Sequence, residues 1–324
     1  MVRCLGALRT QPECVAFGDI IADLEDTVAA GSRLSATMSR YPKVFNKLYL
    51  TMVRMGEDTG QLETSMERLS GWIERDESLN QQLKSSLTYP VFVLALSVVL
   101  TLGIFTVVLP SFISIFEEMN TPLPLITKVL VFLTKCTCSP LAWTLGLALI
   151  GALWLAVHNI CQDEKQKANA FSLLLRMPGI GGLLFHGSSA RYCAALATLL
   201  SSGMDVTRAL KLAASASGNP VIERDAKKLM DSVSEGAQMS AHMSAFPEIY
   251  SRTLSQMAVA GEESSKLPEM FERAGAFHEL ELKSSMEALS AALEPLLLAG
   301  VAIVVGTILV AIFLPLYGIL ENLG

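Results

Sequence analysis

Two acidic clusters carry the side chains best suited to chemistry in this sequence. The first is GEDTGQL, residues 56–62, and the second is GEESSKL, residues 261–267. In each cluster a glutamate directly follows a glycine, as Glu57 follows Gly56 and Glu262 follows Gly261. Paired carboxylates can act as general acid and base when their surroundings hold their pKa values apart. Such a site usually needs further polar groups, and no histidine, cysteine or set of metal ligands is repeated beside these glutamates.

The same two clusters are also typical of the end of one helix and the start of the next. Gly56 can supply the left-handed residue that closes a helix. Asp58 or Thr59 can then cap the following helix, whose first apolar residue is Leu62. Capping does not account for the glutamates, because their neighbours could serve equally well. We therefore expect no catalytic residue here, and a packing role or a contact with a partner for both glutamates.

No other catalytic pattern stands out in the sequence. The phosphate-binding motif G-x-x-x-x-G-K-[ST] is absent, and so are H-E-x-x-H and G-x-S-x-G. The four histidines are scattered, and the six cysteines form no recognisable metal site. No cluster of basic residues interleaved with aromatic residues points to nucleic acid. The sequence therefore predicts a protein that is not an enzyme, holds no cofactor or metal, and does not bind nucleic acid.

The two acidic clusters belong to a long internal repeat. The difference in position between Gly56 and Gly261, called here the repeat offset, relates further residues without a gap from Gly31 to Pro110. A series of this length is not expected by chance, so the sequence predicts a tandem duplication of a soluble segment followed by an apolar segment. Ser265 replaces Gly60 in the second copy. Other matched pairs are Gly31 with Gly236, Pro42 with Pro247, Pro90 with Pro295, and Pro110 with Pro315.

Three apolar stretches are candidate membrane spans. Hydrophobic residues make up 51% of the chain and charged residues only 17%, which is too apolar for an ordinary soluble protein. The stretches 91–109, 141–157 and 296–314 contain no aspartate, glutamate, lysine or arginine. A span needs about 17–25 residues, so the length of the second stretch is near the lower limit and the lengths of the other two lie within the range. The second stretch has no counterpart in the repeat and is expected to act as a connector.

Prolines bracket two of these spans. The interval between Pro90 and Pro110 equals the interval between Pro295 and Pro315. At the rise of an α-helix this interval corresponds to about 30 Å, one hydrocarbon thickness. Pro90 and Pro295 suit the first turn of a helix, where the missing N–H costs little. Pro110 and Pro315 would end or kink the span.

The distribution of lysine and arginine predicts the orientation. Residues 1–90 carry ten of the 25 basic residues and residues 158–294 carry thirteen, whereas 113–140 carry two and the C-terminal tail none. Basic segments remain on the cytoplasmic side. We therefore expect a cytoplasmic unit 1–90, a span 91–112, a periplasmic loop 113–139 and a span 140–158. A second cytoplasmic unit 159–294, a span 295–316 and a periplasmic tail 317–324 follow.

The soluble segments have helical periodicity. Leu62, Met66, Leu69 and Ile73 recur at steps of four, three and four, which places them on one face of a helix. No stretch alternates with the period of a strand. The predicted fold class is all-α, a polytopic membrane protein with two duplicated cytoplasmic helical bundles and three transmembrane helices. The repeat offset places Met1 on Val206, so the first unit is expected to be N-terminally incomplete.

Taken together, these motifs resemble one known family. The motifs that carry the resemblance are GEDTGQL and GEESSKL, TYPVF and LEPLLL at the span entrances, and the stretch from MPGIGGLL to ARYCAALATLLSSGMDVTRAL. In order and spacing they are similar to the F-type inner-membrane platform proteins of type II secretion systems and type IV pilus assembly, that is, the general secretion pathway protein F and PilC-like proteins. The resemblance covers nearly the whole chain. We take the repeated positions as candidate residues for structure or for partner contact: Gly56, Glu57, Gly60, Gly261, Glu262, Pro90, Pro110, Pro295, Pro315 and Glu294.

The resemblance implies a multi-pass protein of the bacterial inner membrane without enzymatic activity. It implies contact with a cytoplasmic secretion or pilus ATPase, with other inner-membrane assembly proteins and with pilin-like subunits, and a homo-oligomeric state. Such a platform would couple ATP hydrolysis by its partner to pilin or pseudopilin assembly and protein export. The alternative is a small membrane transporter or channel component. The absence of ionisable residues from the spans weighs against this alternative, because such residues usually mark ion paths.

Overall fold

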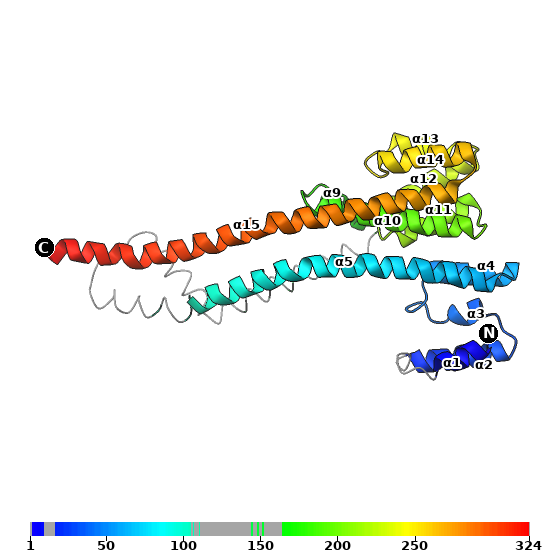
Figure 1. Cartoon of the computed structure of the whole chain (residues 1–324), viewed down its shortest axis with the longest axis horizontal. Coiled ribbons are helices and arrows are strands. Elements are labelled where there is room, and N and C mark those ends of the chain that lie inside the picture. Colours follow the sequence, from blue (N-terminus) through cyan, green and yellow to red (C-terminus); the bar gives the residue numbers. More distant parts are fainter. Residues whose placement is uncertain are drawn as a thin grey trace. The chain divides into compact units, whose positions relative to one another are not determined.

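The structure, a computed structural model, describes residues 2–9, 17–104 and 164–323, together with single positions at 106, 110, 144, 148 and 151. Every regular element in this part of the chain is a helix, and it contains no strand (Figure 1). The predicted all-helical class is therefore confirmed. The loop predicted over 113–139 and nearly all of the span predicted over 140–158 lie outside the described residues.

The described residues of the N-terminal part, 2–9 and 17–104, form five helices. They are α1 (Val2–Arg9), α2 (Gly18–Ala29), α3 (Leu34–Met38), α4 (Lys47–Thr59) and α5 (Leu62–Gly103). Local sequence signals set their ends, since Gly31 adopts a positive φ of 87° just after α2. Asn46 caps α4 by accepting a hydrogen bond from the backbone N–H of Tyr49 at 3.0 Å.

The C-terminal part forms a longer series of helices that ends in a single helix of 57 residues. Asn219 and Ser251 cap α12 and α14 through their side-chain oxygens. The series is α9 (Glu164–Leu175), α10 (Ile180–Ser201), α11 (Val206–Ala216), α12 (Pro220–Ser234), α13 (Met239–Ala245), α14 (Arg252–Ser264) and α15 (Leu267–Leu323).

The repeat offset also relates helix boundaries. It carries both ends of α4 onto the ends of α14, and the first residue of α5 onto the first residue of α15. Gly31 and Gly236 have nearly the same φ, 87° and 91°. Residues that match in type across the two copies therefore also match in local conformation.

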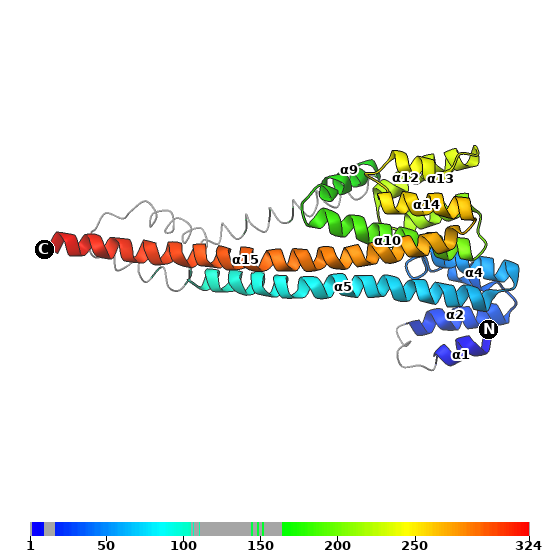
Figure 2. The ribbon, with the colours of Figure 1, turned by 45° about the horizontal axis from the view of Figure 1, so that its top comes forward.

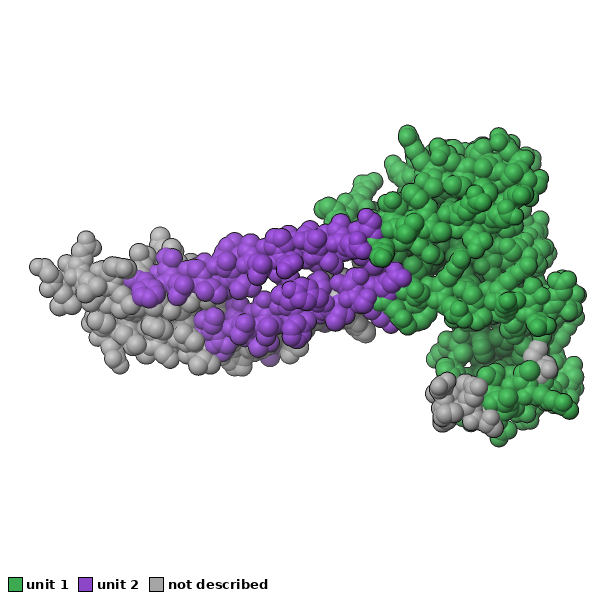
Figure 3. Space-filling view, in the orientation of Figure 1, with its two compact units in different colours: residues 1–81, 168–283 green, residues 82–167, 284–324 purple. Residues whose placement is uncertain are grey.

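The chain forms two compact units that do not follow chain order (Figure 3). Unit 1 contains residues 1–81 and 168–283, and unit 2 contains residues 82–167 and 284–324. In unit 1 one hydrophobic core includes side chains from both segments, among them Met52 and Trp72 from the first and Tyr192, Leu196 and Phe271 from the second. The two soluble segments thus share a core within unit 1.

Polar contacts also join the two segments of unit 1. Arg191 of α10 donates from Nε to Oδ1 of Asp76 on α5 at 2.7 Å, and its Nη2 donates to Asn80. The side chains of this ion pair are largely buried, with 25% of Arg191 and 30% of Asp76 exposed. Arg75 of α5 pairs with Glu272 of α15 at 3.2 Å. The helix α10 is therefore held to α5 by charged hydrogen bonds as well as by apolar contact.

Among the described residues, two helices, α5 and α15, are long and apolar enough to cross a membrane (Figure 2). The helical segments that pass this test are Leu62–Gly103 and Leu267–Thr307, and almost none of the most apolar part of each is buried within the protein. The pair α9 and α10, bent by 117°, would pass the same test if counted as one span. Tyr192, Leu196 and Leu199 of α10 are fully buried in the core of unit 1, which is not the environment of a lipid-facing helix.

Candidate functional site

The repeated glutamates cap helices that lie earlier in the chain. Glu262 of α14 accepts a hydrogen bond at Oε1 from the backbone N–H of Met239, the first residue of α13, at 2.7 Å. It also accepts from the backbone N–H of Ser240 at 3.4 Å and from the Ser240 hydroxyl. The ordinary N-cap residue of α13, Gln238, makes no side-chain cap. Glu262 therefore satisfies backbone donors that this helix end leaves free.

The first copy repeats the arrangement with α3. Glu57 of α4 accepts from the backbone N–H of Ser35 at 3.3 Å and from the Ser35 hydroxyl at 2.5 Å. Arg33, the residue before α3, makes no side-chain cap. Ser35 and Ser240 are themselves related by the repeat offset, so both partners of the interaction are repeated. The negative charge of each glutamate also suits the positive end of the helix that it caps.

The hydrogen bonds of these sites are those of a helix cap. Within the described residues no group of three or more histidine, cysteine, aspartate or glutamate side chains could hold a metal ion. Each carboxylate accepts from a serine hydroxyl and from backbone N–H groups, one for Glu57 and two for Glu262. Sequence reasoning missed Ser35 and Ser240 as partners because they are distant in the chain. Their own match at the repeat offset was the signal that could have revealed them.

The prediction that Gly56 ends a helix is wrong. Gly56 lies inside α4 and Gly261 lies inside α14. A Cβ atom on Gly56 would lie 2.8 Å from Cβ of Ser65 and 2.9 Å from Cα of Leu62. A Cβ atom on Gly261 would lie 3.0 Å from Cα of Leu267 and 2.8 Å from its Cδ2. Glycine is therefore required because the backbone of the following helix approaches too closely for a side chain.

The left-handed residue that closes α4 is Gly60, with φ 71°. Ser265 closes α14 in the same conformation, with φ 57°, and is the sole non-glycine residue with positive φ in the described ranges. The backbone N–H of Lys266 donates to the carbonyl oxygen of Gly261 at 3.0 Å. The serine therefore keeps the cap geometry although it lacks the conformational freedom of glycine.

The expected caps of the next helix are also corrected. Asp58 forms an ion pair with Arg33 at 2.7 Å, and the Thr59 hydroxyl donates to the carbonyl oxygen of Met55 at 2.8 Å. Both residues belong to α4, so neither can cap α5. The sequence places the helix boundary too early, because Gly56 is required by packing and Gly60 by the turn.

The prolines predicted for the first turn of a span lie instead inside long helices. Pro90 belongs to α5 and Pro295 belongs to α15, which also contains Pro315. That prediction fails because each soluble helix and the apolar segment after it form one continuous helix. Pro90 cannot donate to the carbonyl of Ser86, and this carbonyl oxygen lies 3.5 Å from Oγ of Ser290, at the limit of a hydrogen bond.

The remaining candidate positions lie near the ends of these segments. Glu294 is part of α15. Pro110 is helical, but the residues directly before and after it lie outside the described part of the chain. The structure therefore brings Glu57 and Glu262 to helix ends, and it places Pro90, Pro295 and Glu294 along α5 and α15 without joining them into one site.

Two surface cavities are lined by residues of unit 1, and one of them includes the repeated motif. One, of about 400 Å³, is lined by Glu262 and Gly261 together with Leu200 and the first residues of α15. The other, of about 300 Å³, has two arginines, Arg68 and Arg75, and one acid, Glu272, around Trp72. Arg68 donates to the carbonyl oxygen of Ser201. Both cavities are open and mix charge with apolar surface, as contact sites for other proteins do.

Two histidines that are distant in the sequence meet in unit 1. Nδ1 of His186 lies 3.1 Å from Nδ1 of His278, and Nε2 of His278 lies 2.8 Å from the Ser251 hydroxyl. Burial, together with the neighbouring His186, lowers the pKa of His278 to about 4. Burial also lowers the pKa of His186. The pair is therefore neutral near pH 7 and forms a partly buried polar contact between α10 and α15.

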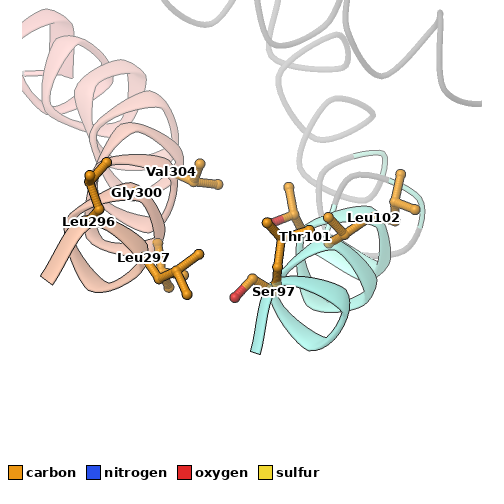
Figure 4. A pocket seen from close by; sticks show the side chains of 10 residues that line it. Ser97, Thr101, Leu102, Leu296, Leu297, Gly300 and Val304 are labelled. Carbon is orange, nitrogen blue, oxygen red and sulfur yellow. The ribbon is translucent and has the colours of Figure 1, made fainter. Parts of the chain in front are cut away.

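An apolar groove lies between α5 and α15 in unit 2 (Figure 4). It has a volume of about 290 Å³, and no ionisable side chain lines it. The lining residues are Leu94, Ser97, Val98, Thr101 and Leu102 of α5, and Leu296, Leu297, Gly300, Val301 and Val304 of α15. The Ser97 hydroxyl donates to the carbonyl of its own helix, at Val93. The described part of this groove therefore offers apolar contact.

Comparison with known proteins gives a consistent result. The family model of type II secretion system protein F matches residues 1–110 and 192–315. A type IV pilus assembly protein PilC of Thermus thermophilus is 30% identical over all of this chain and 79% of its own length. A type II secretion system protein F of Xanthomonas campestris is 31% identical over 99% of this chain and 79% of its own length. A PilC of Pseudomonas aeruginosa is 28% identical over 92% of this chain and 79% of its own length.

Proposed function

The chain belongs to the type II secretion system protein F family, and from this premise we propose that it is the inner-membrane platform of a type II secretion or type IV pilus-like machine. The platform couples a cytoplasmic ATPase to pilin or pseudopilin assembly and to protein export. Relatives named for pilus assembly and for secretion match the chain about equally well, so the proposal includes both kinds of machine.

The family and the two apolar helices support a location in the inner membrane. The proposed topology has three spans, with residues 1–90 and 159–294 in the cytoplasm and residues 113–139 and 317–324 in the periplasm. The basic residues gathered in the two soluble segments support this orientation. The proposed architecture is a duplicated pair of helical bundles, supported by the helix boundaries that match at the repeat offset.

The observation that carries the proposal is the continuity of α5 and α15. Each helix begins in unit 1, directly after the helix that carries a capping glutamate, and continues without a break into an apolar segment. A continuous helix resists bending much more than a loop does. A displacement that a motor protein imposes on unit 1 would therefore pass along both helices into the membrane. This is the coupling that a platform must provide.

The proposed partners follow from this coupling. A cytoplasmic ATPase supplies the movement, and the open cavity around Trp72, Arg75 and Glu272 is one candidate contact surface. Other inner-membrane assembly proteins and pilin-like subunits would contact the apolar segments, and the platform would assemble as a homo-oligomer. We propose no catalytic role for this chain. The alternative, a transporter or channel, has no support from the uncharged groove between α5 and α15.

A flexible insertion tests the mechanical proposal. Gly-Gly-Ser inserted after Gln82 in α5 and after Lys283 in α15 should leave membrane insertion and co-purification with the ATPase intact. Secretion or pilus formation should be lost, because the insertion interrupts the rigid connection in both helices. The matched control places the same insertion after Gly31 and after Gly236, in turns between helices. Normal secretion by the double-helix insertion variant would contradict coupling through these helices, and failure to recover any ATPase with the unmodified chain would contradict the proposed partner.

A further inference from the structure

A cluster of apolar side chains is exposed where α9 turns into α10. Leu173, Leu174, Met177 and Ile180 all lie on the surface, and Leu173 is 68% exposed. They lie within one short stretch of unit 1. Exposed apolar patches of this kind usually mark a contact with another protein or with a membrane.

The backbone of this turn is fixed by its sequence. The two helices are bent by 117°, and Gly179 adopts a positive φ of 84°. A Cβ atom on Gly181 would lie 2.1 Å from the carbonyl oxygen of Leu175, so this position admits only glycine. The backbone N–H of Gly181 donates to the carbonyl of Met177 at 2.8 Å. The sequence therefore fixes the sharp turn between α9 and α10, called here the corner, that carries the exposed apolar side chains.

The corner lies at the end of unit 1 that also holds the last residues of α15 in this unit. A Cβ atom on Gly187 would lie 3.7 Å from a methyl group of Leu282, near the last residue of α15 in unit 1. Further along α10, Cys193 and Ala194 lie beside Gly275, so α10 and α15 run antiparallel. Ile180, which precedes Gly187, is therefore at the same end of unit 1 as Leu282.

The charges around the corner suit an anionic surface. Arg176 lies between Leu174 and Met177 and is exposed, and Lys167 is exposed on α9. Basic residues flanking an apolar face are the pattern of segments that lie in the interface of a membrane with anionic lipids. We infer that the corner formed by Leu173–Ile180 inserts into the cytoplasmic headgroup region of the inner membrane and holds unit 1 against the lipid surface. This inference rests on the proposed orientation, with unit 1 in the cytoplasm.

Fluorescence quenching in vesicles tests the inference. The full chain would carry a fluorescent amino acid at Met177 and be reconstituted into vesicles of phosphatidylethanolamine and phosphatidylglycerol. Some lipids would carry a nitroxide either near the top or near the end of the acyl chain. We expect a label at Met177 to lose most of its fluorescence with the shallow nitroxide and much less with the deep one.

Two control labels calibrate the measurement. Ile303 is an exposed residue in the apolar half of α15, and a label there should be quenched by the deep nitroxide. Quenching at Ile303 establishes insertion, so a failure at Met177 then counts against the inference and not against the proposed topology. Val259 is exposed like Met177, but its neighbour Gly261 packs against Leu267 at the opposite end of unit 1. A label there should be quenched by neither nitroxide.

A charge variant tests the role of the lipid headgroup. Lys167→Glu combined with Arg176→Glu should abolish the difference in quenching at Met177 between phosphatidylglycerol vesicles and phosphatidylcholine vesicles. Arg208→Glu, on α11, is the matched control and should leave this difference unchanged. A label at Met177 that behaves like the label at Val259 would overturn the inference. A label at Met177 whose fluorescence changes only after secretion or pilus proteins are added would also overturn the inference, since the corner would then bind a protein.

Discussion

At the residue scale, each repeated glutamate replaces a cap that the local sequence lacks. A helix end leaves several backbone N–H groups without partners, and the residue just before the helix usually satisfies one of them. Here Gln238 and Arg33 make no such bond, and Glu262 and Glu57 supply it from another helix. The same carboxylate therefore stabilises a helix end and fixes the position of one helix relative to another.

Removal of this cap should loosen α13 locally. We expect Glu262→Ala to destabilise the bundle by about 1 kcal/mol, the usual loss for a missing cap. Hydrogen exchange in the full chain should become faster at the amides of Met239 and Ser240, which donate to Glu262. Glu263→Ala is the matched control, since Glu263 is exposed on the same helix. Equal exchange in the two variants would show that Glu262 is an ordinary surface acid.

The buried side chain of His278 predicts a dependence of stability on pH. His278 has a pKa of about 4 in the folded protein, whereas an unfolded histidine has a pKa of about 6.5. Below pH 6.5 the unfolded chain therefore binds more protons, and the free energy of unfolding falls as the pH is lowered toward 4. The melting temperature should decrease over this interval, and His278→Asn should reduce the decrease. An unchanged pH profile in the variant would assign the effect to other groups.

At the element scale, glycine sets how closely successive helices approach. Gly56 and Gly261 lie where α4 meets α5 and where α14 meets α15, with no room for a Cβ atom. Gly60 and Ser265 then reverse the chain in the left-handed conformation. The motif that first suggested an acidic site therefore combines a close helix contact, a cap for a third helix and a tight turn within one short stretch of each copy.

Gly56 and Gly71 should respond in opposite directions to substitution by alanine. In Gly56→Ala the new methyl group must displace the backbone at Leu62, and overpacking of this kind costs about 1–3 kcal/mol. Gly71 lies inside α5 with no atom within 4 Å of an added Cβ, so Gly71→Ala should stabilise the helix by about 1 kcal/mol. Thermal unfolding of the two purified variants measures both effects. A Gly56→Ala variant as stable as the original chain would show that α4 and α5 can separate without loss.

At the scale of the whole molecule, the hydrophobic periodicity of the sequence predicts the fold better than the acidic motif predicts its own contacts. Leu62, Met66 and Leu69 lie on the core side of α5, as their spacing predicts, whereas Ile73, predicted for the same face, is 37% exposed. The partners of Glu57 and Glu262 depend on packing between helices, which no local pattern encodes. The predicted helix boundary at Gly56 is misplaced because glycine serves both turns and close contacts. The shared core of residues 1–81 and 168–283 is likewise a long-range property of the chain.

The two segments of unit 1 should differ in their stability when separated. Of the twelve largest fully buried side chains in the described ranges, eleven belong to residues 168–283 and one, Met52, belongs to residues 1–81. Ile73 is 37% exposed, whereas His278, its equivalent in the second copy, is fully buried. Burial of one large apolar side chain contributes about 1.5–3 kcal/mol, and a domain is stable by only about 5–15 kcal/mol.

We therefore expect fragment 168–283 to fold alone, and fragment 1–81 to remain partly unfolded or to self-associate, because it exposes the face that packs against α10 in the intact unit. Circular dichroism melts of the two fragments, with their masses measured in solution, decide between these outcomes. Mixing the fragments should restore a single cooperative transition, since Arg191 can again pair with Asp76 and the shared core can close. A monomeric fragment 1–81 that melts as sharply and at as high a temperature as fragment 168–283 would show that the first segment carries a sufficient core of its own.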